Sequence, residues 1–171
     1  YSLNQVLYLD DVHFTNNYAG VSSILFSDYA NSGGAIWFSN TNTIGVSRIL
    51  HSTFTNNFIL SGWGGAVFIS DSPEGIFIYD VRFLGNSALS SYTYVGQGGA
   101  IMTSHDTVLE VSNCHFQNNT ALPRTDAQNK PYTLSGAGGA VYIQSANVTL
   151  TNNTFTQNIV VSGQFDAGSL G

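Results

Sequence analysis

The stretch Gly64-Gly65-Ala66-Val67, followed within the same repeat by Phe83-Leu84-Gly85-Asn86, decides the fold of this chain. The Gly-Gly-Ala motif also begins at Gly33, Gly98 and Gly138. Successive Phe residues of the second motif are 40, 29, 33 and 39 residues apart, an interval typical of stacked supersecondary units, so the chain is a repeat array. The second motif, Phe-x-x-Asn, comprises Phe14 and Asn17, Phe54 and Asn57, Phe83 and Asn86, Phe116 and Asn119, and Phe155 and Asn158.

When the repeats are aligned on Phe, each one predicts two short strands joined by a tight turn. The position three residues before Phe carries Asp, His or Asn, side chains expected to face out or to turn the chain. The positions seven and five residues before Phe are mostly apolar and are predicted to point inward. They hold Leu7, Ser47, Ile76, Leu109 and Val148, and Leu9, Ile49, Ile78, Val111 and Leu150.

Like residues at one position of each repeat indicate that the strands pair in parallel with their copies in the next coil, at roughly 4.8 Å. The fold class is therefore all-β, a parallel β-helix of about five coils, and the crossover rule makes it right-handed. Variable inserts are expected at one corner of the coils, over residues 18–32, 58–63, 87–97 and 120–137.

The Phe and Asn columns predict structural ladders. Each buried Phe contributes roughly 1.5–3 kcal/mol, and an Asn stack forms amide-to-amide hydrogen bonds along the axis. The alternative for Asn is a simple surface turn residue, but its presence at one offset in all five repeats favours the ladder. The Gly-Gly pair fits a tight corner better than a phosphate site, because no nucleotide-binding motif accompanies it. No cofactor is expected.

Composition excludes several partners. Charged residues are 8% of the chain, the net charge is −6 and there are four Lys and Arg, which argues against nucleic acid and anionic membranes. No apolar run is long enough for direct membrane insertion, and any targeting signal has been removed or lies outside this sequence. The single Cys114 falls in an inward column and is expected to be a packed thiol.

The ends of the chain look complementary. Residues 1–17 supply the second half of a coil, with residues 6–9 as its strand, and residues 167–171 resemble a degraded Gly-Gly-Ala half. Two interpretations stay open: units that repeat in tandem or stack head to tail, and a cut through a longer solenoid. Under both, residues 1–171 form a single β-helix segment with uncapped ends.

A catalytic site is not indicated. The best candidates, Asp11, His51 and Asp80, occupy one column on adjacent coils, but the next members are Asn113 and Asn152 and no second acidic cluster flanks them. We therefore expect a non-enzyme with no catalytic, cofactor or metal residues. The alternative is a polysaccharide-binding or polysaccharide-cleaving β-helix of the pectin-lyase-like type.

The inserts and sequons suggest surface roles. Aromatic residues in the inserts either bind glycan or protein partners or cover the coil beneath them, and covering is the favoured interpretation. Three sequons mark possible N-glycosylation sites at Asn118, Asn147 and Asn152. Asn147 is expected to lie in a turn.

The repeat pair resembles the repeats of chlamydial polymorphic membrane proteins, whose passenger domains are surface adhesins of the autotransporter class. The matching motifs span residues 14–158. This resemblance implies an extracellular or cell-surface stalk or adhesive segment without catalysis. The complementary ends make further coils of the same kind expected partners, and the aromatic inserts add surface glycans or a cell-surface protein. Such a segment would form part of a surface fibre or filament.

Overall fold

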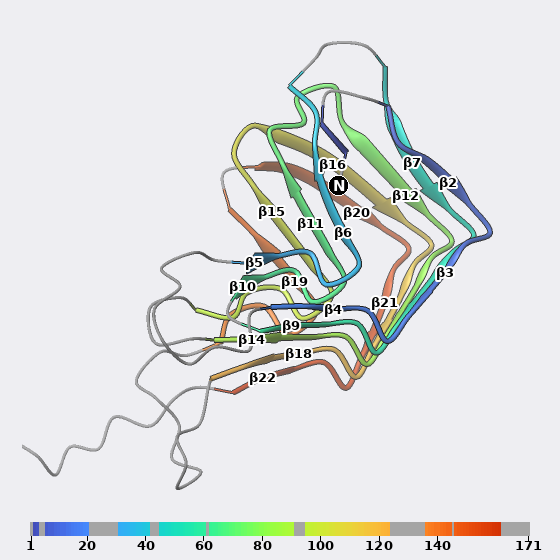
Figure 1. Ribbon diagram of the computed structural model, residues 1–171. Coiled ribbons are helices and arrows are strands. Elements are labelled where there is room, and N and C mark those ends of the chain that lie inside the picture. Colours follow the sequence, from blue (N-terminus) through green and yellow to red (C-terminus); the bar gives the residue numbers. More distant parts are fainter. Residues whose placement is uncertain are drawn as a thin grey trace, which may run out of the picture.

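The chain winds into stacked coils in the computed structural model, which describes residues 2–3, 6–20, 31–41, 45–60, 62–90, 95–123, 136–144 and 146–161. Figure 1 shows successive coils lying one behind another, coloured from blue to red. Neighbouring strands pair in parallel and in register, so Phe77 lies beside Arg48 on one side and Glu110 on the other. The predicted parallel β-helix is confirmed.

Four five-stranded sheets run along the axis, one strand of each coil in every sheet. The first sheet contains β1 (Ser2–Leu3), β6 (Ile36–Ser39), β11 (Val67–Ser70), β15 (Ile101–Ser104) and β19 (Val141–Ile143). The second contains β2 (Tyr8–Asp10), β7 (Ser47–Leu50), β12 (Ile76–Tyr79), β16 (Thr107–Ser112) and β20 (Ala146–Thr151).

The third sheet contains β3 (His13–Thr15), β8 (Thr53–Thr55), β13 (Arg82–Leu84), β17 (His115–Gln117) and β21 (Thr154–Thr156). The fourth contains β4 (Tyr18–Ala19), β9 (Phe58–Leu60), β14 (Ser87–Leu89), β18 (Thr120–Leu122) and β22 (Ile159–Val160). A further two-stranded sheet pairs β5 (Asn31–Ser32) with β10 (Gly62–Trp63), and each of these strands lies directly before the Gly-Gly-Ala motif of its own coil.

Single left-handed residues make the corners on both sides of the third sheet. The corner between the second and third sheets has φ between 47° and 54°, at Asp11, His51, Asp80, Asn113 and Asn152. The corner between the third and fourth sheets has φ between 53° and 64°, at Asn16, Asn56, Gly85, Asn118 and Gln157. Asn, Asp and Gly tolerate this conformation best, which explains why they dominate both corners.

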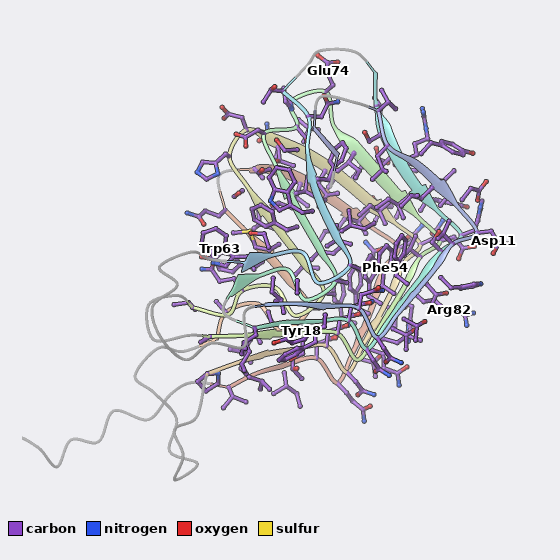
Figure 2. All side chains as sticks on the ribbon, in the orientation of Figure 1. Asp11, Tyr18, Phe54, Trp63, Glu74 and Arg82 are labelled. Carbon is purple, nitrogen blue, oxygen red and sulfur yellow. The ribbon has the colours of Figure 1, made fainter. Side chains whose placement is uncertain are left out.

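The interior holds a column of Phe rings. Phe54, Phe83 and Phe116 are fully buried, and Figure 2 shows Phe54 lying between the sheets. Ring centroids lie 4.9, 5.0, 4.8 and 4.7 Å apart from Phe14 through to Phe155, with interplanar angles of 11° or less. Aliphatic residues of the first and second sheets complete this core, including Ile36, Ile49, Ile69, Ile76, Ile78, Ile101, Leu109 and Val111.

The Asn column forms a continuous hydrogen-bonded ladder beside the Phe stack. Asn86 is typical: its Oδ1 accepts from the backbone N–H (3.0 Å) and from Nδ2 (2.9 Å) of Asn57. Its own Nδ2 donates to Asn119 Oδ1 and to the Phe54 carbonyl, each at 2.9 Å. The side-chain amides are linked in one direction from Asn17 to Asn158.

The two glycines of each Gly-Gly-Ala motif are required for different physical reasons. Gly64 has φ +69°, a conformation that a side chain strains. Gly65 lies where coils and sheets crowd together: a Cβ there would be 2.0 Å from the Gly99 carbonyl oxygen and 2.7 Å from the Ser87 backbone. This corner therefore admits only glycine at its second position.

Three local expectations were wrong. The inserts were predicted to leave the coil directly after the Asn column, but their first residues form the strands of the fourth sheet, whose inward residues Ile59, Ala88 and Ala121 are fully buried. Residues 1–17 were expected to supply the second half of a coil with a strand at residues 6–9, but β1 pairs with β6 of the first sheet and the next strand is Tyr8–Asp10. Asn147 lies in β20 instead of a turn because it pairs with Val108. A turn at residues 72–75 is closed by a 3.1 Å hydrogen bond from Gly75 N–H to the Ser72 carbonyl.

Candidate functional surface

The outer wall where the second and third sheets meet gathers most of the described ionisable side chains. Figure 2 shows Asp11 at this corner and Arg82 projecting from the third sheet. The corner carries Asp11, His51 and Asp80 on successive coils, the three residues singled out as catalytic candidates. Because each sits at a left-handed corner, its side chain projects from a sharp bend and is exposed to solvent.

His51 does not pair with the two carboxylates of its own column. Its Nδ1 lies 2.7 Å from Oδ1 of Asp10, the residue just before the corner in the preceding coil. This hydrogen bond raises the pKa of His51 and lowers the pKa of Asp10. The two side chains are 49% and 41% exposed, so solvent screens the pair and its contribution to stability is small.

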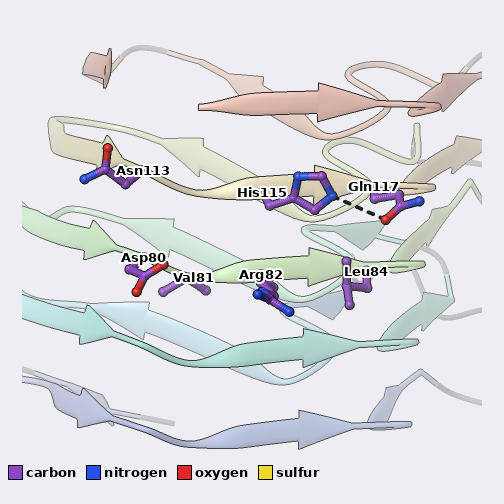
Figure 3. A pocket seen from close by; sticks show the side chains of 7 residues that line it. All are labelled: Asp80, Val81, Arg82, Leu84, Asn113, His115 and Gln117. Carbon is purple, nitrogen blue, oxygen red and sulfur yellow. Dashed lines mark hydrogen bonds between the residues drawn. The ribbon is translucent and has the colours of Figure 1, made fainter. Parts of the chain in front are cut away.

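A shallow hollow lies on the third sheet beside this corner. Figure 3 shows Asp80 and Asn113 at its corner end, with Arg82 on β13 and with His115 and Gln117 on β17. His115 Nε2 and Gln117 Oε1 are 3.3 Å apart. A second hollow adjoins it and shares Asp80 and Arg82 with it. Both are open, and their mixed donors and acceptors suit contact with a polar ligand.

The described residues do not assemble a metal site: no group of three or more His, Cys, Asp or Glu side chains among them could hold an ion. Cys114 is buried, and burial raises the pKa of its thiol to about 11. Its Sγ lies 3.3 Å from the Ser112 carbonyl and 3.6 Å from the Ile78 carbonyl, so it occupies the inward column as a packed thiol.

The outer face of the second sheet holds an aromatic group that the sequence analysis did not single out. Phe77 and Tyr79 have ring centroids 5.9 Å apart at 15°, and His51 meets Tyr79 edge-on at 5.9 Å. On the first coil, Tyr8 is 59% exposed and donates to Asp10 at 3.3 Å. The signal was present as aromatic residues six and four positions before Phe83, but the neighbouring repeats carry other residue types there.

Aromatic residues of the inserts lie in two described places. Tyr18 and Phe58 stack on the outer side of the fourth sheet, with centroids 5.5 Å apart. Trp63 stacks on Phe68 of the first sheet at 5.8 Å and so helps to cover the coil, as the favoured interpretation holds. The other insert aromatics, including Tyr92 and Tyr132, lie outside the described residues, as do the degraded Gly-Gly-Ala half at 167–171 and most of the insert at 120–137.

The three sequon asparagines are all exposed. Asn118 and Asn152 occupy left-handed corners, with φ of 56° and 53°, and Asn147 faces out from β20. The middle residue of the first sequon, Asn119, is fully buried in the Asn ladder. These positions make the side chains accessible, and their glycosylation stays a prediction.

Comparison with known proteins identifies the fold family. The model of the right handed beta helix region matches residues 4–169. The chain belongs to the right-handed β-helix family. The probable autotransporter YfaL of Escherichia coli (strain K12) is 33% identical to it over 147 residues, which are 83% of this chain and 10% of that protein. The chain thus spans about a tenth of this relative's length. No solved structure gives a significant match.

In the described part of the chain, no helix is long and apolar enough to cross a membrane.

Proposed function

We propose that this chain is a segment of a surface-exposed autotransporter passenger, in which it acts as a stiff, non-catalytic stalk with adhesive sides. One observation carries the proposal: positions inside the coil repeat, whereas positions outside it vary. All five coils place Phe and Asn in the two ladders. In contrast, one outward column of the second sheet reads Tyr8, Arg48, Phe77, Glu110 and Thr149.

Two similarities support an extracellular location. The relative YfaL is named a probable autotransporter, and the repeat pair resembles that of chlamydial surface adhesins. Antibodies raised against this chain should label intact cells of its source, and added protease should remove the label. Labelling that requires permeabilised cells would contradict the proposal.

Absence of catalysis is the second part of the proposal. Asp11, His51 and Asp80 are exposed, the hollows beside them are open, and His51 is hydrogen-bonded to Asp10 instead of facing an enclosed substrate site. Purified chain incubated with acidic and neutral polysaccharides should release neither reducing ends nor unsaturated products. Cleavage that disappears in His51→Ala, with the fold retained, would establish the polysaccharide-cleaving alternative instead.

Further coils of the same kind are the proposed axial partners. On the fifth coil, Leu150, Phe155 and Ile159 are 44%, 47% and 50% exposed, although their counterparts in the third and fourth coils are buried or half-buried. The two ends of the Asn ladder are also complementary. Asn158 presents N–H donors at the fifth-coil end, and Asn17 presents its Oδ1 acceptor at the first-coil end. Such coils belong to the same chain or to a second copy.

Electron microscopy tests stacking between copies. Filaments with an axial repeat of roughly 24 Å, the height of five coils, are expected. They should be lost in Phe155→Asp, which places a carboxylate on the exposed end of the Phe column. Isolated short rods at the same concentration would contradict stacking of copies.

Glycosylation is the last expectation to test. Secretion of the chain from a eukaryotic cell should give a mass that falls on enzymatic removal of N-glycans, and the loss should shrink in Asn152→Gln. An unchanged mass would refute glycosylation at these sequons.

A further inference from the structure

Asp80 and Arg82 carry opposite charges on the third coil, yet they are not paired with each other. Asp80 lies at the corner between the second and third sheets, Arg82 lies two residues later on β13, and both side chains are exposed. Among the described residues, the ion pairs comprise His51 with Asp10 alone, and the Asp80 carboxylate and the Arg82 guanidinium form no hydrogen bond. Figure 3 shows these two side chains standing apart along one hollow, so their hydrogen-bonding capacity is free for a ligand.

We propose that the hollow beside Asp80 and Arg82 binds a small zwitterion of the α-amino acid class, which carries one ammonium group and one carboxylate. The ammonium group donates to the Asp80 carboxylate, and the carboxylate of the ligand accepts from the Arg82 guanidinium. This inference goes beyond the stalk function proposed above and does not depend on it.

The two protein charges match the two halves of such a ligand. A guanidinium presents N–H donors in a planar fork that fits both oxygens of a carboxylate. An ionised carboxylate only accepts hydrogen bonds, and an ammonium group offers three donors. Each half of the zwitterion therefore forms charge-assisted hydrogen bonds, which are about twice as strong as those between neutral groups.

The rest of the hollow supplies a polar rim and one apolar surface. Its volume is about 410 Å³, within the range of small-molecule sites. Asn113, His115 and Gln117 line it from the fourth coil, and His115 pairs in register with Arg82. Gln117 Oε1 lies 3.3 Å from His115 Nε2 and so holds the imidazole ring in place. Leu84 lies beyond Arg82 on β13 and offers an apolar contact to the hydrocarbon part of the ligand.

The surrounding charges disfavour simpler ions. A lone anion at Arg82 would meet Asp80 in the same hollow, in a chain whose net charge is −6. A lone cation at Asp80 would lie beside the guanidinium. His51 does not neutralise Asp80 by hydrogen bonding, because its Nδ1 is bonded to Asp10. A zwitterion satisfies both charges at once and adds none.

The test is an NMR titration of the isotope-labelled whole chain with glycine, alanine or glutamine. Because the hollow is open and water competes for both charges, dissociation constants on the order of 1–10 mM are expected. The amide signals of residues 80–84 and 113–117 should shift and reach saturation. Acetate and methylammonium, which each carry one half of the zwitterion, should bind about tenfold more weakly or worse.

Two variants and two matched controls assign the binding to these side chains. Arg82→Gln and Asp80→Asn should each weaken binding about tenfold or more, because each removes one charge-assisted contact. Arg48→Gln removes an exposed arginine from the second sheet, and Asp11→Asn removes a carboxylate from the equivalent corner of the first coil. Both controls should bind like the original chain. Circular dichroism checks that all four variants keep their sheet content.

Several results would overturn the proposal. They are no saturable shift with any of the three amino acids, binding of acetate or methylammonium as tight as that of glycine, and an equal loss in the variants and their controls. Shifts that saturate only at residues outside the third and fourth coils would also overturn it. None of these results bears on surface labelling of cells, so failure here is distinguishable from failure of the passenger assignment.

Discussion

Replacing one internal Asn of the ladder should destabilise the solenoid far more than replacing the first Asn. In Asn86→Ala, the backbone N–H and one Nδ2–H of Asn57 lose their acceptor in a fully buried site. Each buried unsatisfied donor costs about 1–3 kcal/mol, so the expected loss in unfolding free energy is about 2–6 kcal/mol. The Phe54 carbonyl also loses a donor.

Asn17→Ala is the matched control, because Asn17 begins the ladder. Its loss removes one bond, from Nδ2 to Asn57 Oδ1, and that oxygen still accepts from the Asn17 backbone N–H. The expected cost is about 0.5–1.5 kcal/mol. Urea denaturation followed by circular dichroism measures both variants.

A further variant separates hydrogen bonding from packing. Asn86→Asp keeps the shape of the side chain but turns an oxygen toward Asn119 Oδ1 and the Phe54 carbonyl, so it should be at least as damaging as alanine at neutral pH. Equal costs for Asn86→Ala and Asn17→Ala, or a harmless Asn86→Asp, would refute the ladder as a source of stability.

Three more changes test other parts of the structure. Thr103→Val should raise the unfolding free energy by about 1 kcal/mol, because the buried Thr103 hydroxyl has no hydrogen-bond partner among the described residues; a lower thermal midpoint would contradict this. Gly65→Ala should lower the unfolding free energy by about 3 kcal/mol or more, since its Cβ would overlap the Gly99 carbonyl; a normal urea midpoint would be the opposing result. Asp10→Asn should return the pKa of His51 toward 6.5 in an NMR titration, because the hydrogen bond to Asp10 raises it. The contribution of protonated His51 to the unfolding free energy is complete below pH 6.5 and is lost as pH rises through the raised pKa of His51. The contribution of ionised Asp10 is lost as pH falls through the pKa of Asp10, which lies below 3.8. An unchanged His51 pKa in the Asn variant would contradict the pairing.

The internal architecture was predictable because its physical requirements recur in every coil. Phe83 must stack on its neighbours, Asn86 must satisfy the backbone of the preceding coil, and Gly65 must admit a carbonyl at close range. Each requirement leaves the same residue type at the same offset, so period and fold follow from the sequence. The fourth sheet was missed because its strands have two or three residues, too few for an alternation such as Ser87-Ala88-Leu89 to stand out.

The outer surface was less predictable because no requirement repeats there. The column alignment placed His51 with Asp11 and Asp80, but alignment does not say where a side chain at a left-handed corner points. In the structure it reaches Asp10. Phe77 and Tyr79 share an outer face with Arg48 and Glu110, so no residue type recurs from coil to coil in these columns.

The one-way Asn ladder gives the solenoid an electrical direction. In each sheet the backbone hydrogen bonds point alternately up and down the axis, so their dipoles largely cancel. The ladder amides do not alternate: from Asn17 to Asn158 each Nδ2 donates toward the C-terminal coil. Their dipoles therefore add, with the negative end at the first coil and the positive end at the last. Neighbouring amides polarise one another, so each added coil should strengthen the bonds already formed and lengthen this axial dipole.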